Sequence, residues 1–264
     1  PLPEIDKMAR GNRKIGLGVM GFADLLVRLK MRYGSLSSIE MAERIICFIK
    51  EKAERTSRDI AESRGSFPNI DASTVTSPRR NATLLSIAPT GTISLIAGCS
   101  SGIEPYYAIS YSRTVLEGQH LNETLPTFLE VARKDGFLDD DLLMELSTVR
   151  SIQYLTKVPP DVRNIFVIAH DVPVDEQIDM QAAFQRHVDN AVSKTINLPA
   201  SATWQDILHA FTYAHSRRCK GVTVYREGSK PGQVLTTIRD SRHCPECGRL
   251  MRGEEGAMQC DSCG

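Results

Sequence analysis

Residues 80–105 read RNATLLSIAPTGTISLIAGCSSGIEP and carry more information than any other stretch of the chain. Apolar runs, Leu84 to Ile87 and Ile93 to Ile96, flank a centre rich in hydroxyl side chains. Within that centre, Pro89 stiffens the approach and Gly91 lets the backbone bend close to a ligand. This order predicts a buried strand, a turn and a helix N-terminus whose free N–H groups face an anion such as phosphate. An ordinary strand–turn element is the alternative.

The whole chain sets the limits for such a site. Its 264 residues are enough for one large domain with a substantial core and a small appendage. It carries 32 basic and 32 acidic residues, which argues against a general polyanion binder, so any anion site must be local. No apolar run approaches the roughly 18 residues of a membrane helix, and no signal peptide is present, so we expect a soluble protein. Because the chain starts with Pro1 and ends on Cys263-Gly264, we expect a piece of a longer polypeptide.

Hydrophobic periodicity predicts an α/β body, because helices alternate with single strands. The helical patterns cover residues 12–33, 38–64, 125–149, 180–191 and 203–215. The strand patterns cover residues 106–116, 165–169 and 221–225. We interpret Lys194-Thr195-Ile196-Asn197 as a helix end whose polar groups face either a polar substrate or a loop. The resulting domain division is a body at 1–228, a polar linker at 229–242 and a tail at 243–264.

Residues 16–21, GLGVMG, match the G-x-G-x-x-G pattern of dinucleotide-binding proteins. That site needs a hydrophobic strand directly before the glycines and an acidic residue at the end of the second strand. The preceding residues, RGNRK at 10–14, do not form a buried strand, and the acidic residue has no counterpart. We therefore expect these glycines to serve close helix packing.

The tail contains two C-x-x-C-G knuckles separated by twelve residues, at Cys244, Cys247, Cys260 and Cys263. Each knuckle directs two thiolates at one point, and four thiolates in tetrahedral geometry favour zinc. A pair of redox dithiols is the alternative. The spacing predicts a small four-cysteine zinc ribbon, a module that does not by itself reveal a function. Cys99 and Cys219 have no partner in the sequence and cannot be called catalytic.

Four segments in order resemble the large catalytic subunit of ribonucleotide reductases. They are NRKIGLGVMGFA at 12–23, the stretch from Arg80 to Pro105, SKTINLP at 193–199 and KGVTVYR at 220–226. The resemblance is strongest to the adenosylcobalamin-dependent (class II) enzymes, many of which end in a cysteine-rich zinc domain. It implies that the body is the C-terminal part of a ten-stranded α/β barrel.

The resemblance also implies a role for the opening stretch, which is to hold the diphosphate of a ribonucleotide substrate. The residues implied in this contact are Pro89, Thr90, Gly91, Thr92, Ile93 and Ser94. In the family a thiyl radical abstracts the ribose 3′-hydrogen, and two cysteines then reduce the 2′-carbon. The implied product is a 2′-deoxyribonucleotide for DNA synthesis. The implied cofactors are adenosylcobalamin and zinc.

One tyrosine indicates the class of reductase. Diiron (class I) enzymes carry two adjacent tyrosines where this chain has Val224-Tyr225, and they relay a radical through them from a separate subunit. A single Tyr225 favours a radical made locally by cobalamin. The alternatives are a diiron-type large subunit and a non-catalytic zinc-ribbon protein that binds nucleic acid. The neutral charge balance does not support the latter.

The family's radical cysteine, with its Asn and Glu neighbours, precedes the first matched segment, and so do its redox cysteines. No residue of this chain takes those catalytic roles, so we expect the piece alone to be inactive. The resemblance further implies a homodimer and a thioredoxin- or glutaredoxin-type reductant. It implies neither a membrane nor a direct nucleic-acid partner, and it places the protein in the cytoplasm.

Overall fold

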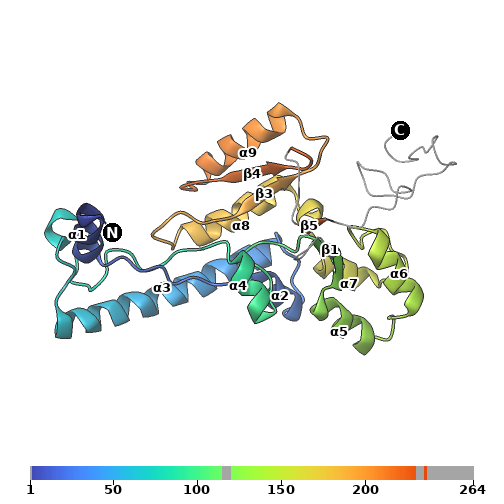
Figure 1. Ribbon diagram of the computed structural model, residues 1–264, viewed down its shortest axis with the longest axis horizontal. Coiled ribbons are helices and arrows are strands. Elements are labelled where there is room, and N and C mark those ends of the chain that lie inside the picture. The colour runs from blue at the N-terminus through green and yellow to red at the C-terminus, as the bar shows by residue number, and fades with distance from the viewer. Residues whose placement is uncertain (1, 115–119, 230–234, 237–264) are drawn as a thin grey trace.

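The computed structural model describes residues 2–114, 120–229 and 235–236 (Figure 1). The α-helices are α1 (Pro3–Asn12), α2 (Phe22–Arg28), α3 (Leu36–Arg64), α4 (Gly91–Ala97), α5 (Pro126–Lys134), α6 (Asp140–Thr148), α7 (Pro160–Ile165), α8 (Val174–Gln185) and α9 (Trp204–Ser216). Two short 3₁₀ turns are η1 (Ile70–Ala72) and η3 (Ala169–Asp171). The strands are β1 (Ser110–Thr114), β2 (His120–Thr124), β3 (Thr195–Leu198), β4 (Thr223–Arg226) and β5 (Leu235–Thr236).

A row of parallel extended segments forms the frame of the molecule. Leu17 bridges Leu85 and Ile87 bridges Val192, both in parallel. Farther along, β3 pairs in parallel with β4, from Thr195 opposite Thr223 to Leu198 opposite Arg226. These pairings order the segments as 15–17, 84–87, 192–198 and 223–226. Because parallel segments need long crossover connections, helices occupy the intervening chain.

Helices cover this frame and enclose three apolar clusters. In the first, α8 packs on α3, and Phe22, Leu85 and Phe184 are among its buried members. A second cluster, around Phe128 and Phe166, joins α5, α6 and α7, which gather at one end of the molecule (Figure 1). The third lies between α8, α9 and the β3–β4 pair. The frame is therefore fixed from several sides, which positions the turn that follows residue 87.

The structure confirms two of the predicted helices and one predicted strand, and places their ends. The pattern at 38–64 is α3, where the Ser35 hydroxyl accepts from the Ser38 N–H at the N-terminus. The pattern at 203–215 is α9, which begins with a capping box between Thr203 and Asp206. The strand predicted at 221–225 is β4. These elements have strong periodicity and a local start signal, and both are visible in the sequence.

The helix predicted over residues 12–33 is wrong for its first half. The backbone from Arg13 to Met20 contains no helix, and its Leu17 N–H donates to the Leu84 carbonyl at 2.8 Å. A Cβ on Gly18 would lie 2.2 Å from the Ser86 carbonyl oxygen. The glycines thus permit close contact between two extended segments, rather than the helix packing that we expected.

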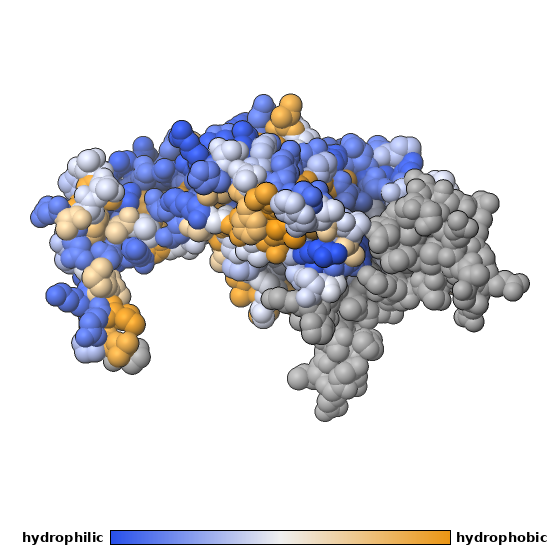
Figure 2. All heavy atoms as spheres, turned by 90° about the horizontal axis from the view of Figure 1, so that it is seen from above, coloured by the Kyte–Doolittle hydropathy of each residue, from blue (hydrophilic) through white to orange (hydrophobic). Residues whose placement is uncertain are grey.

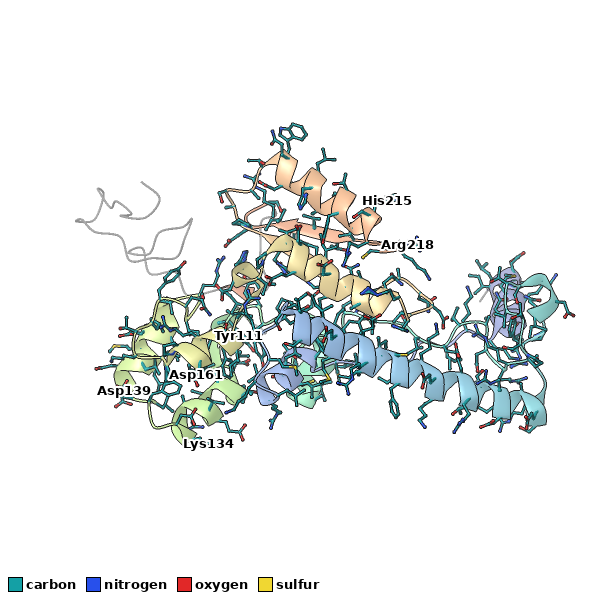
Figure 3. The ribbon with its side chains drawn as sticks, turned by 180° about the vertical axis from the view of Figure 1, so that it is seen from behind. Tyr111, Lys134, Asp139, Asp161, His215 and Arg218 are labelled. Carbon is teal, nitrogen blue, oxygen red and sulfur yellow. The ribbon has the colours of Figure 1, made fainter. Side chains whose placement is uncertain are left out.

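Four other expectations need correction. The helix predicted over 180–191 is α8, which begins and ends six residues earlier, at Val174 and Gln185. The helix predicted over 125–149 is two helices, interrupted between Lys134 and Asp139, where Asp139 caps α6 (Figure 3). Residues 165–169 belong partly to α7, and only Ile168 makes an isolated bridge, to Tyr106. Lys194–Asn197 is not a helix end, because α8 stops at Gln185 and β3 begins at Thr195.

The surface seen from above is largely hydrophilic but has apolar patches (Figure 2). Trp204, Leu208 and Phe211 of α9 are 69%, 51% and 47% exposed. On α4, Ile96 is 83% exposed. In the part of the chain that the structure describes, no helix combines the length and hydropathy needed to cross a bilayer.

Candidate functional site

The candidate phosphate-binding site is the turn between the buried stretch 84–87 and α4. Leu84, Leu85 and Ile87 are at most 1% exposed, whereas Ala88, Pro89 and Gly91 lie at the surface. Helix α4 starts at Gly91, immediately after the turn. The predicted turn and helix N-terminus are therefore confirmed, whereas the predicted strand is a buried extended stretch with single bridges at Leu85 and Ile87. The first N–H groups of an α-helix have no partner inside the helix, so this end offers donors to an anion.

Thr90 shapes the turn. Its φ of 54° is left-handed, which is uncommon for a β-branched residue. The Thr90 carbonyl accepts from the Ser94 N–H at 2.9 Å, and its hydroxyl oxygen accepts from the Gly102 N–H at 2.7 Å. The hydroxyl hydrogen is left to donate elsewhere, because accepting a hydrogen bond does not consume it. Thr90 thus has both a fixed position and a donor available.

The six candidate residues do not all face the same way. Thr92 and Ile93 are exposed near the open end of α4, but Ser94 is only 1% exposed. The Ser94 hydroxyl donates to the Gly91 carbonyl at 3.1 Å and lies 2.9 Å from the Ser101 hydroxyl. Ser94 therefore holds α4 to the segment that returns after it, while Thr90 and Thr92 lie nearer the turn.

That return segment, residues 100–104, is held along its length. The Ser100 N–H donates to Asp24 at 2.6 Å, and the Tyr33 hydroxyl donates to the Ile103 carbonyl at 2.6 Å. Burial, reinforced by the charge of Glu104, raises the pKa of Tyr33 well above its usual value, so this hydroxyl stays a donor. Sequence reasoning missed these contacts, because Asp24 and Tyr33 lie about seventy residues away along the chain.

Glu104 ends the return segment and contacts the start of β3. One carboxylate oxygen accepts from the Thr195 N–H at 2.7 Å, and the other lies 3.4 Å from the Lys194 ammonium. Burial lowers the pKa of Lys194, and the carboxylate of Glu104 opposes that shift. The segment around 194–197, which we expected to face either a substrate or a loop, therefore contacts the return segment of the site.

Cys99 and Cys219 belong to the described part of the chain, and the four tail cysteines do not. Burial and nearby Asp24 raise the pKa of the Cys99 thiol, and burial raises that of Cys219, so both favour the protonated form. The tail cysteines at 244, 247, 260 and 263 lie outside the described residues. Among residues 2–114, 120–229 and 235–236, no cluster of three or more His, Cys, Asp or Glu side chains could hold a metal ion.

Known proteins share both the sequence and the fold of this chain. Residues 1–79 and 74–225 match the family model described as ribonucleotide reductase, barrel domain. A vitamin B12-dependent ribonucleoside-diphosphate reductase of Mycobacterium tuberculosis (strain CDC 1551 / Oshkosh) is 45% identical over 239 residues, covering 90% of this chain and 34% of the relative. The enzyme of that name from Thermoplasma acidophilum is 44% identical over 249 residues, covering 93% of this chain and 32% of the relative.

The fold has a solved counterpart. The Actinobacillus ureae class Id ribonucleotide reductase alpha subunit superposes with a TM-score of 0.72 at 21% identity. The match covers 86% of this chain and 42% of that subunit, and it shows the fold alone. The chain spans about a third of the length of the two relatives named above.

Proposed function

This chain belongs to the ribonucleotide reductase family, within its barrel domain, and from that premise we propose that it is part of a cobalamin-dependent ribonucleoside-diphosphate reductase. Such an enzyme reduces ribonucleotides to 2′-deoxyribonucleotides and so supplies DNA precursors. The names of the relatives support both the cofactor and the diphosphate substrate. For this part of the chain, the proposal rests on the turn at 88–92. This turn has an exposed helix N-terminus, and the Thr90 hydroxyl there is held by a hydrogen bond from the Gly102 N–H.

We assign the diphosphate of the substrate to the residues from Pro89 to Ser94. The proposed donors are the first N–H groups of α4 and the hydroxyls of Thr90 and Thr92. Ser94 holds α4 in place through its contact with the Ser101 hydroxyl. Binding the diphosphate there orients the ribose toward the radical cysteine, which we place in another part of the polypeptide. Remote binding energy of this kind lowers the barrier of the chemical step by positioning the reacting group.

Cobalamin supplies the radical chemistry when it is bound. The residues described around α4 offer hydroxyl side chains and backbone N–H groups, which suit an anion rather than a corrin ring. No residue around α4 is therefore assigned to the cofactor. In this proposal, residues 1–228 form part of the catalytic barrel and contact the substrate. The complete enzyme is proposed to be a cytoplasmic homodimer that a thioredoxin- or glutaredoxin-type protein reduces.

Turnover of the complete polypeptide tests the class of enzyme. With adenosylcobalamin and a dithiol reductant alone, we expect reduction of ribonucleoside diphosphates, because the single Tyr225 leaves the tyrosine pair of a subunit-to-subunit relay incomplete. The measurement is deoxyribonucleotide formed per enzyme, with diphosphate and triphosphate substrates compared. Activity that requires a diiron partner subunit would assign the chain to class I instead. A clear preference for triphosphates would contradict the assignment of the diphosphate.

We propose that residues 243–264 form a four-cysteine zinc ribbon joined to the body by 229–242. The support is the spacing of the two C-x-x-C-G knuckles. Cys244→Ser is expected to remove about one equivalent of zinc in metal analysis, because three thiolates bind zinc less tightly than four. Single-turnover reduction should persist in the same variant. Cys219→Ser is the matched control and should leave the zinc content unchanged. Unchanged zinc in Cys244→Ser would refute the ribbon.

A further inference from the structure

Lys194 is the most deeply buried charged side chain near the candidate site. Its side chain is 0% exposed. Lysine is almost never fully buried unless its charge is paired. The ammonium lies 3.4 Å from a Glu104 oxygen, 3.2 Å from the Gln177 side-chain oxygen and 3.0 Å from the Thr195 carbonyl. These three acceptors match its three donors, so the cation is fully satisfied at this position.

Glu104 connects this cation to the return segment of the site. Its carboxylate faces Lys194 with one oxygen and accepts from the Thr195 N–H with the other. Its own N–H donates to the Ser101 carbonyl at 3.0 Å, which closes a tight turn over residues 101–104. The ion pair therefore fastens this four-residue turn to the beginning of β3.

The same turn touches the candidate phosphate-binding residues directly. The Gly102 N–H donates to the Thr90 hydroxyl at 2.7 Å, and the Ser101 hydroxyl pairs with that of Ser94. A Cβ on Gly102 would lie 3.0 Å from the Ala88 carbonyl oxygen, so backbone approaches backbone here without a side chain between. Gly102 lies only two positions before Glu104, so these two residues cannot move far independently of each other.

We propose that the Lys194–Glu104 pair is a positioning device that fixes the turn at 88–92 through residues 101–104, and thereby sets the affinity for the substrate's diphosphate. This inference rests on the proposed function. Without the lysine, Glu104 is left as a partly buried charge with no cation beside it. Keeping an unpaired carboxylate partly buried costs free energy, so the side chain moves toward water. That movement displaces Gly102 and releases the hydroxyl of Thr90. The affinity for phosphate therefore falls, while the rate of the chemical step does not.

The test uses the complete polypeptide with its cofactor and reductant, and it compares Lys194→Met with Glu104→Gln. The isosteric Glu104→Gln removes only the charge and keeps an oxygen for Thr195, so it serves if the first variant fails to fold. For Lys194→Met we expect the KM for a ribonucleoside diphosphate to rise at least tenfold, with kcat changed less than threefold. For Glu104→Gln we expect a rise of at least threefold. The Kd of the matching nucleoside, which has no phosphate, should stay within twofold in both.

Lys157→Met is the matched control, because Lys157 also pairs with acids, among them Asp141 at 3.3 Å, but lies in the loop between α6 and α7. It should leave KM, kcat and both affinities unchanged. Glu104→Gln with an unaltered KM would overturn the proposal, as would equal weakening of nucleoside and diphosphate binding, which marks a general structural role. If the unaltered enzyme binds diphosphate no better than nucleoside, the assignment of the phosphate site itself fails, which is a distinct result.

Discussion

Gly18→Ala is expected to destabilise the protein by about 3 kcal/mol, the upper part of the range for overpacking a well-packed site. The new Cβ would lie 2.2 Å from the carbonyl oxygen of Ser86, closer than real Cβ contacts allow. The two backbones cannot simply separate, because Leu17 exchanges hydrogen bonds with Leu84 and Ser86 at 2.8 and 3.0 Å. Relief of the clash must therefore break part of the parallel pairing that leads into the candidate site.

Gly91→Ala is the matched control for that substitution. Nothing lies within 4 Å of a Cβ at Gly91, and Gly91 starts helix α4 without a left-handed φ. We expect a gain of about 0.5 kcal/mol there, since alanine lowers the entropy of the unfolded chain. Thermal unfolding of the two variants and the parent protein measures both effects. Equal melting temperatures for Gly18→Ala and the parent would show that the contact at Ser86 is not rigid.

These two glycines also show what a single sequence can and cannot predict. Gly91 stands between an apolar run and a hydroxyl-rich stretch, and that local order was enough to predict strand, turn and helix. Gly16 and Gly18 sit among residues with helical spacing, so the local pattern indicated a helix. Pairing with residues 84–86, nearly seventy positions away, decides the conformation instead, and tertiary contacts of this kind override local pattern.

The same division applies to the site. The turn formers and hydroxyls between Pro89 and Ser94 made this stretch a candidate anion site, and the family resemblance implied the full set of six residues. Their supports were not visible, because Asp24 and Lys194 come from distant parts of the chain. Lys194 was misplaced at a helix end for a related reason. In a sequence, polar residues beside a short strand resemble the end of a helix, and only the pairing of β3 with β4 shows that they belong to a strand.

Asp189→Ala is expected to cost about 3 kcal/mol or more, because one carboxylate oxygen holds two backbone N–H groups of the strand that enters the site. Asp189 Oδ2 accepts from the Leu84 N–H at 2.6 Å and from the Leu85 N–H at 3.1 Å. Both leucines are at most 1% exposed, so their N–H groups cannot turn to water. An unsatisfied buried donor costs about 1–3 kcal/mol, and bonds to a charged acceptor lie at the strong end.

Asp189→Asn separates the loss of charge from the loss of the acceptor. The amide oxygen can occupy the same place and accept from both N–H groups, so we expect a cost of about 1 kcal/mol. Asp59→Ala, an exposed position in α3, is the matched control and should change stability by less than about 0.5 kcal/mol. Amide hydrogen exchange reports the site directly: protection of Leu84 and Leu85 should fall sharply in Asp189→Ala and survive in Asp189→Asn. If protection of these two amides is unchanged in Asp189→Ala, then the strand holds its place by its parallel pairing alone, and the turn at 88–92 does not depend on the carboxylate.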